Sequence, residues 1–175
     1  QAFTDDAGLN SVFNVNAGGS FAGVAAGSNM VLQATNNITL ANAFNLATAT
    51  GGAANVSLTL QANNNITVNA GATVTVTGSG TLNMQADADH SGAGTLAVNA
   101  ALVSRQGGIT LSGAAITSSA AGSITSTGTA GQNAGNISIT SSGGINLLGA
   151  LAANGGNGAA AAAGGFGWKL PRVRG

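Results

Sequence analysis

The sequence predicts an all-β protein folded as a parallel β-helix, or β-solenoid, with about five regular three-stranded coils of about 24–28 residues. Three observations support this prediction. A strand-like segment recurs along the chain at a nearly constant spacing, its residues alternate between apolar and polar, and Gly and Asn separate the segments. A fixed repeat of this length is typical of solenoids, in which each repeat buries its apolar face against the next.

The first strand of each coil is expected at a segment such as Met30-Val31-Leu32-Gln33. Its third residue recurs at steps of 28, 24, 27 and 28 residues, as Leu32, Leu60, Met84, Leu111 and Ile139. Alternation with a period of two marks a half-buried strand, so these side chains should point into the core. The residues that follow them should point outward, namely Gln33, Gln61, Gln85, Ser112 and Thr140.

A second strand should begin five or six residues later, at Ile38–Leu40, Ile66–Val68, Ile116–Thr117 and Ile145–Leu147. In the third coil it begins twelve residues after Met84, at Leu96–Val98, so a loop of about six extra residues is inserted there. A third strand is expected eight residues further on, at Leu46, Val74, Ile124 and Ala153, and six residues further on at Leu102.

Other architectures explain this pattern less completely. A helix is disfavoured because Ile, Val and Thr are frequent and Gly or Asn interrupts every run. An antiparallel sandwich would contain short strands, but it gives no reason for them to recur at matching offsets. In a parallel β-helix each residue lies about 4.8 Å from its equivalent in the next turn. Asn36–Asn37 and Asn63–Asn65 should therefore form a stacked amide ladder at one corner.

The composition limits the classes of function. Only 5% of the residues are charged, the formal net charge is zero, and one Pro accompanies 29 Gly. Disorder usually comes with net charge and Pro, so stacked sheet fits better. Nucleic acid is not an expected partner, because binding it needs clustered Lys and Arg. Three of the four basic residues, Lys169, Arg172 and Arg174, lie in the last seven positions, and only Arg105 lies in the repeats. No transmembrane segment is expected, since no run of eighteen apolar residues occurs.

No catalytic, cofactor-binding or metal-ligating residue is assigned, and no cofactor is expected. The chain has no Cys, and its four acidic residues are Asp5, Asp6, Asp87 and Asp89, so no carboxylate pair for sugar hydrolysis is recognisable. Asp87, Asp89 and His90 form one polar cluster in the inserted loop. Weak Ca²⁺ binding is one interpretation of this cluster. A solvated loop is the other, and we prefer it because calcium loops need more oxygen ligands.

Three segments carry a resemblance to a known family: 60–68 (LQANNNITV), 85–94 (QADADHSGAG) and 135–146 (GNISITSSGGIN). They resemble the large bacterial exoproteins of the filamentous haemagglutinin type and are similar to autotransporter-like β-strand-repeat proteins. This resemblance spans roughly residues 30–160. It implies a right-handed β-helix, secretion across a Gram-negative outer membrane, and work as an extended surface or matrix adhesin. We therefore expect a non-enzymatic, secreted extracellular segment of a longer adhesin or matrix filament.

The two ends of the sequence differ from the repeats. Residues 1–29 are expected to form an N-terminal cap or an imperfect first coil, residues 30–160 the repeats, and residues 161–175 a C-terminal tail. Within the tail, 164–175 holds the only Trp, Lys and Pro of the chain. This segment should cover the open last coil or bind a neighbour. An uncovered coil end offers unpaired strand edges, so we expect self-association end to end where no tail covers it.

The outward polar ladders suggest the partners. Other copies of the chain, or host and matrix glycans and surface proteins, are expected, because these ladders offer neutral hydrogen-bond donors and acceptors. Ice binding is an alternative, since the second strands present Thr39, Thr67, Ala97, Thr117 and Asn146 outward. This array is not a regular Thr repeat, and strand propensity also explains its Thr residues. Glycan binding and a polysaccharide-active enzyme are the remaining alternatives.

Overall fold

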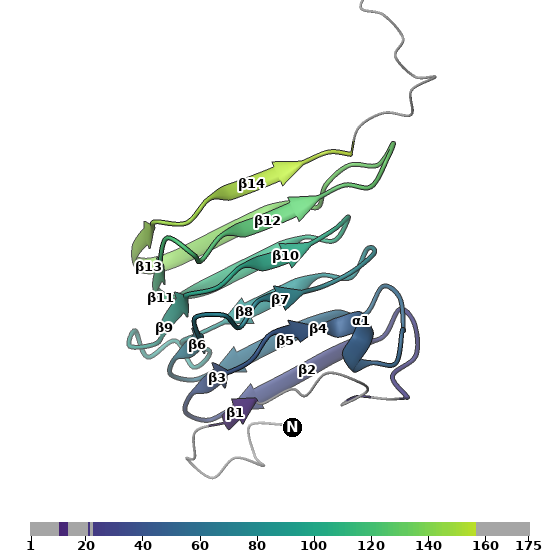
Figure 1. Ribbon diagram of the computed structural model, residues 1–175. Coiled ribbons are helices and arrows are strands. Elements are labelled where there is room, and N and C mark those ends of the chain that lie inside the picture. The colour runs from purple at the N-terminus through teal and green to yellow at the C-terminus, as the bar shows by residue number, and fades with distance from the viewer. Residues whose placement is uncertain (1–10, 14–20, 22, 157–175) are drawn as a thin grey trace, which may run out of the picture.

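The computed structural model describes residues 11–13, 21 and 23–156. Within them the chain is a parallel β-solenoid of about four turns, and Figure 1 shows these turns stacked from β1 to β14. The predicted all-β solenoid is confirmed. The number of turns is about four, where about five coils were predicted. The right-handed winding stays a prediction.

Three walls enclose a narrow core. The first wall contains β2 (Asn29–Ala34), β5 (Ser57–Ala62), β8 (Leu82–Gln85) and the first parts of β11 (Ile109–Ser118) and β13 (Ile137–Leu147). The second wall contains β1 (Ser11–Phe13), β3 (Ile38–Leu40), β6 (Ile66–Val68), β9 (Thr95–Val98) and the remainder of β11 and β13. The third wall contains β4 (Phe44–Asn45), β7 (Val74–Thr75), β10 (Leu102–Ser104), β12 (Ile124–Thr127) and β14 (Leu151–Asn154).

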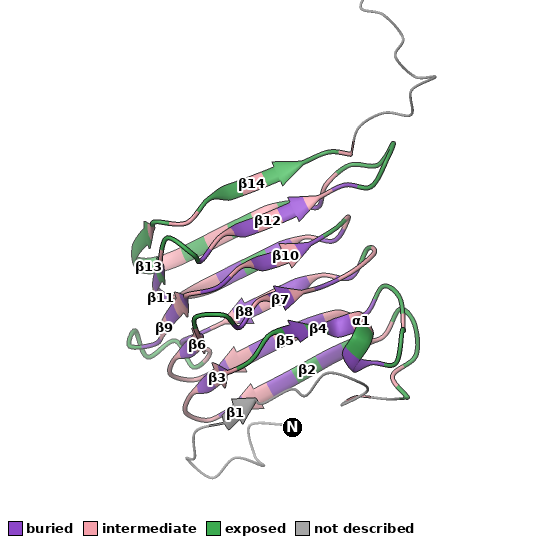
Figure 2. Cartoon of the chain, viewed as in Figure 1, coloured by how far each residue is buried: buried purple, intermediate pink, exposed green. Residues whose placement is uncertain are grey.

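The predicted register of the first two walls is confirmed. Equivalent residues lie opposite one another in the first wall, in the order Leu32, Leu60, Met84, Leu111 and Ile139. The second wall aligns Ile38, Ile66, Leu96, Ile116 and Ile145 in the same way. The inward side chains of the middle turns are buried, as the purple strands in Figure 2 show. Like residues therefore stack on like along the core.

The third wall differs from the prediction at two positions. Phe44, not Leu46, lies opposite Val74, and Leu151, not Ala153, lies opposite Ile124. In these two turns the third strand is in register six residues after the second strand, where an offset of eight was predicted. Leu46 instead begins the short helix α1 (Leu46–Ala49), because the Asn45 side chain accepts hydrogen bonds from the first backbone N–H groups of that helix.

The first and second strands merge in the last two repeats. β11 and β13 each run through both walls, which join into one nine-stranded sheet, while the third wall is a five-stranded sheet. Separate strands were predicted there. The pairing of β11 with β13 shifts register between Gly113 and Ala115, where the chain turns the corner without the Asn residues of the first turns. A local irregularity at the corner thus replaces the predicted break between the two strands.

The predicted amide ladder at the first corner is confirmed. The Asn64 amide donates to the side-chain oxygen of Asn36 over 3.2 Å. The side-chain oxygen of Asn37 accepts from the backbone of Asn65, and that of Asn65 accepts from the backbone of Thr95, over 2.9 and 2.8 Å. The side-chain oxygens of Asn36, Asn37 and Asn65 therefore each accept from a donor in the next turn, where the corner interrupts the sheet ladder.

The N-terminal end of the core is covered. Strand β1 pairs with β3, and Phe21 packs edge-to-face on Phe44 with ring centroids 6.1 Å apart. Met30 and Leu32, in the first turn, are each only 9% exposed. The remainder of the predicted 1–29 cap lies outside the described residues. In the described part of the chain, no helix has the length and apolar character needed to cross a membrane.

Candidate functional site

The outer surface of the first wall is polar and carries almost no charge. Three glutamines form a hydrogen-bonded ladder along it: Gln33 donates to Gln61 over 2.7 Å, and Gln61 donates to Gln85 over 2.9 Å. In residues 23–156 the only charged side chains are Asp87, Asp89 and Arg105. The predicted outward ladder is therefore present, and its three Gln side chains are already hydrogen-bonded to one another.

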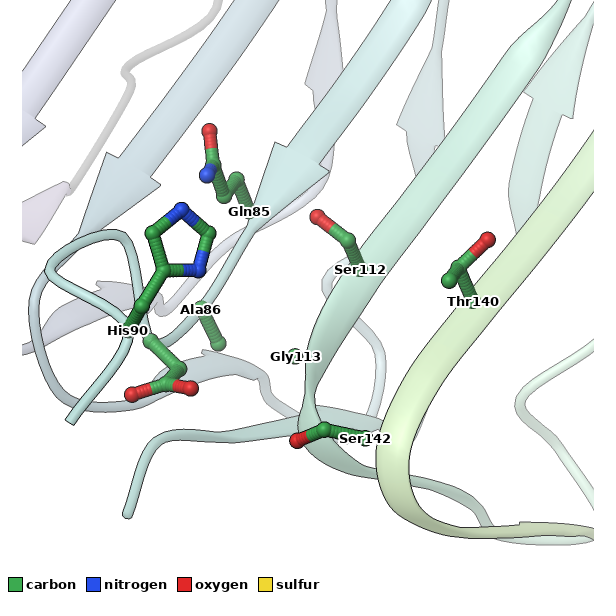
Figure 3. Close-up of a pocket in the computed structure, with 8 residues that line it drawn as sticks. Gln85, Ala86, His90, Ser112, Gly113, Thr140 and Ser142 are labelled. Atoms are coloured by element: carbon green, nitrogen blue, oxygen red, sulfur yellow. The ribbon is translucent and has the colours of Figure 1, made fainter. Parts of the chain in front are cut away.

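The glutamine ladder ends at Gln85. The next two residues in register are Ser112 and Thr140, whose side chains are too short to reach the Gln85 amide. This change in side-chain length leaves a hollow of about 160 Å³ beside the inserted loop. Figure 3 shows Gln85, Ser112 and Thr140 in a row on neighbouring strands, with His90 on the loop beside Gln85. We call this hollow the ladder-end pocket; its lining residues are Gln85, Ala86, Asp87, His90, Ser112, Gly113, Thr140 and Ser142.

Backbone hydrogen bonds hold the inserted loop, residues 86–94, against the turns on both sides. The N–H groups of Asp87 and Ala88 donate to the carbonyl oxygens of Asn64 and Ala62 in the turn before, over 3.0 and 2.9 Å. The Gly94 carbonyl accepts from Ala114 in the turn after, over 2.8 Å. The loop is therefore a fixed wall of the ladder-end pocket.

Asp87 holds the loop in shape. One oxygen of its carboxylate accepts from the Ser91 hydroxyl over 3.0 Å and from the Gly92 N–H over 2.9 Å. Burial raises the pKa of Asp87, but hydrogen bonds from Gly92, Ser91, Ala93 and Gly94 outweigh this and leave the pKa below its usual value. Asp87 is only 6% exposed, so the predicted fully solvated loop is wrong at this residue.

Asp89 and His90 are exposed, as a solvated loop predicts. The Asp89 carboxylate accepts from the Ser91 N–H over 3.2 Å, so both acids of the Asp-x-Asp pattern bind their own loop. Among the described residues, no group of three or more His, Cys, Asp or Glu side chains lies close enough together to hold a metal ion. This arrangement gives Asp87 and Asp89 a loop-closing role.

The ladder-end pocket offers neutral hydrogen-bonding groups. Gln85 lines the pocket; its side-chain oxygen accepts from Gln61, and its NH₂ group donates to no described residue. The hydroxyl groups of Ser112, Thr140 and Ser142 and the His90 ring also line it. With this volume and chemistry, the pocket can accept a small neutral polar group such as one sugar unit, which also presents hydroxyl donors and acceptors.

The Thr ladder considered for ice binding is interrupted. Thr39 and Thr67 lie opposite each other, but Ala97 separates them from Thr117, and Asn146 follows. No continuous row of Thr hydroxyls therefore crosses this wall in the described turns.

The C-terminal edge of the solenoid is open within the described residues. Strand β13 pairs with β11 and β14 with β12, and neither has a described neighbour on its other side. Ile145 and Leu151 occupy inward positions, yet they are 49% and 54% exposed, whereas their equivalents Ile116 and Ile124 are buried. Figure 2 shows this edge as the exposed end of the stack.

Comparison of the chain with models of known protein families, with curated proteins and with solved structures finds no match. The candidate surfaces are therefore the ladder-end pocket, the polar outer wall and the C-terminal edge. Sequence reasoning found the wall and the edge but missed the pocket. The signal was present, because the residue after the inward position changes from Gln to Ser after the third coil. The predicted tail, 161–175, lies outside the described residues.

Proposed function

We propose that the chain is a structural and adhesive β-solenoid, a segment of a secreted bacterial surface adhesin or extracellular matrix filament. The polar outer wall, with one Arg and two Asp in the described turns, carries this proposal. Such a wall can contact neutral polymers or other copies of the chain without salt bridges. The resemblance of segments 60–68, 85–94 and 135–146 to filamentous haemagglutinin-type exoproteins supports an extracellular location and a non-enzymatic role.

Adhesion through this wall should depend little on salt. Interactions between exposed charges are screened strongly above about 0.1 M salt, because the Debye length falls to about 10 Å there. Contacts between hydroxyl and amide groups lack this screening. Salt dependence therefore separates the proposed wall contact from non-specific charge attraction.

The experiment couples the full chain to beads and measures their adhesion to each other and to glycan-coated surfaces at low and high salt. We expect adhesion that salt leaves unchanged. Replacing exposed wall residues, as in Thr110→Glu with Ser138→Glu, should reduce it, because like charges on facing walls repel. The matched control, Ala120→Glu with Ala121→Glu, adds the same charge at an exposed corner. Beads that do not adhere, or that adhere only at low salt, would contradict the proposal.

Glycan binding at the ladder-end pocket is a second candidate function. The Gln85 amide and the hydroxyls of Ser112 and Thr140 favour it, since these residues line one hollow of single-sugar size. The full chain would be screened on a panel of neutral glycans. The test variant is Ser112→Gln, which extends the glutamine ladder by one step and fills the pocket. Hits that Ser112→Gln abolishes support this function, and a panel without hits contradicts it.

A further inference from the structure

The glutamine ladder has a direction. The Gln33 NH₂ group donates to the Gln61 oxygen, and the Gln61 NH₂ group donates to the Gln85 oxygen, so both bonds run toward the C-terminal turns. At Gln85 the oxygen is therefore occupied, whereas the NH₂ group donates to no described residue. The ladder ends with a hydrogen-bond donor, and the group that would continue it is an amide oxygen.

The register leaves the next position of the ladder without an amide. Ser112 lies opposite Gln85, and Thr140 lies opposite Ser112, so two hydroxyl residues occupy the positions of a fourth and a fifth glutamine. Neighbouring turns are about 4.8 Å apart. A ligand amide placed outside Ser112 would therefore lie one turn from the Gln85 amide, as Gln85 lies one turn from Gln61.

The part of the ladder-end pocket between its polar side chains is apolar. Figure 3 shows Ala86 and Gly113 between Gln85, His90 and Ser142. Ala86 ends in a methyl group, and Gly113 has no side chain to fill the space beside it. A Cβ added to Gly113 would lie 3.4 Å from the Ala86 Cβ, which is ordinary van der Waals contact. This part of the pocket therefore suits a ligand methyl group.

We propose that the ladder-end pocket binds the acetamido group of a neutral N-acetylated sugar in the place of the missing glutamine amide. The ligand carbonyl accepts from the Gln85 NH₂ group, and the ligand N–H donates to the hydroxyl of Ser112 or Thr140. The ligand methyl group packs on Ala86 and Gly113. This assignment rests on the proposed glycan binding and names the class of sugar that the pocket selects.

The charge at the pocket favours a neutral sugar. Asp87 lines the pocket, and its carboxylate accepts hydrogen bonds from Ser91 and Gly92, which stabilise the ionised form. No Lys or Arg is among the lining residues. A sugar carboxylate or sulfate would therefore meet a like charge without a cation to neutralise it. An acetamido group carries no charge and matches the amide and hydroxyl groups of the pocket.

A glutamine side chain of a partner protein is the other source of an amide. Such a side chain ends in an NH₂ group, whereas the acetamido group of a sugar ends in a methyl group. The apolar surface of Ala86 and Gly113 favours the methyl group, and the sugar hydroxyls can bond to the surrounding polar side chains. The pocket therefore fits the sugar better than the protein side chain.

Saturation-transfer NMR with the full chain tests this assignment, because it detects weak binding and shows which ligand protons contact the protein. The probes are N-acetylglucosamine and N-acetylgalactosamine. Glucose and galactose are the counterparts without an acetamido group, and N-acetylneuraminic acid is the anionic counterpart. We expect the two neutral N-acetyl sugars to give signals several-fold stronger than the other three, with the strongest signal at the acetyl methyl protons.

Two variants locate the binding. Gln85→Glu keeps an oxygen that accepts from Gln61 but removes the NH₂ donor, and Ser112→Gln supplies the missing glutamine itself. Each should reduce the acetyl methyl signal several-fold. Ser138→Gln is the matched control, because it adds the same side chain at an exposed position of the same wall outside the pocket, and it should keep the signal.

Equal signals from the neutral sugars with and without the acetamido group would overturn the assignment and leave glycan binding in place. A signal that both variants retain would also contradict it, because the sugar would then lie elsewhere. A stronger signal from a tripeptide with a central glutamine would replace the sugar by a protein side chain as the occupant. No signal from any sugar would refute both this assignment and glycan binding at the pocket, whereas salt-independent adhesion through the outer wall would stand.

Discussion

Ser104 and Ser126 lie opposite each other on adjacent strands of the third wall, both fully buried, but only one of their hydroxyls is satisfied. Ser126 donates to the Arg105 carbonyl over 2.7 Å, whereas the Ser104 hydroxyl has no hydrogen-bond partner. A buried hydroxyl without a partner costs about 1–3 kcal/mol of stability. Ser104→Ala should therefore raise the free energy of unfolding, by about 1 kcal/mol.

Ser126→Ala is the matched comparison for that variant, because it removes a satisfied hydroxyl from the neighbouring position. It should lower the free energy of unfolding by about 1 kcal/mol, since the Arg105 carbonyl loses its partner. Denaturant unfolding of both variants measures the difference. Equal changes of the same sign would show that the two hydroxyls have the same surroundings, against the structure.

The glutamine ladder should stabilise the stack. Gln61 is its central member and takes part in two side-chain hydrogen bonds, to Gln33 and Gln85. Gln61→Ala removes both, and we expect a loss of about 1–2 kcal/mol in the free energy of unfolding. Thr67→Ala is the control, because Thr67 is outward-facing and already lies opposite an alanine, Ala97. A loss no larger than that of the control would mean that the ladder contributes nothing.

Stability should decrease in acid because of Asp87. Its pKa is lowered in the folded state, so its contribution is complete above the unfolded value of about 3.8 and is lost as the pH falls through the folded pKa. The free energy of unfolding should therefore rise with pH across this window. Asp87→Asn should flatten that rise, while Asp89→Asn in the same loop should keep it. Unfolding curves over the acid range measure the slope, and an unchanged slope in Asp87→Asn contradicts the loop-closing role.

Glycine stacking at one corner leaves no space for a side chain. A Cβ added to Gly107 would clash with the backbone carbonyl of Gly80, and one added to Gly135 would clash with that of Gly107. Gly107→Ala should therefore force the turns apart and lower the melting temperature by several degrees. Gly144→Ala is the control, because nothing lies within 4 Å of the added carbon. If both variants have the same melting temperature, the turns do not stack as closely as described.

Much of the fold could be predicted from the sequence because stacking repeats the same environment at each turn. The steps between Leu32, Leu60 and Met84 define the register directly, and the structure places these residues opposite one another. The third wall was harder. The number of residues between the second and third strands alternates from turn to turn. The offset of eight that fits some turns therefore misplaces the third strand at Phe44 and Leu151.

The surfaces were predicted less completely, for a physical reason. Period-two alternation shows which side chains face outward, but it cannot show which of them bind each other. The Gln33–Gln61–Gln85 ladder and the hollow after it depend on side-chain length in register, which only the stacked turns reveal. Burial of Asp87 was missed likewise, because backbone contacts to Asn64 and Ala62 hold its loop inward.

Every proposal above depends on turns that stack in register, and amide hydrogen exchange of the full chain tests this most directly. We predict slow exchange for the inward segments 58–60, 82–84 and 109–111, with comparable protection in each, and faster exchange for residues 89–93 at the tip of the inserted loop. Such a pattern follows because the strand N–H groups bond to the neighbouring turn, while the loop tip is exposed. Fast exchange throughout all three segments would contradict the stacked solenoid.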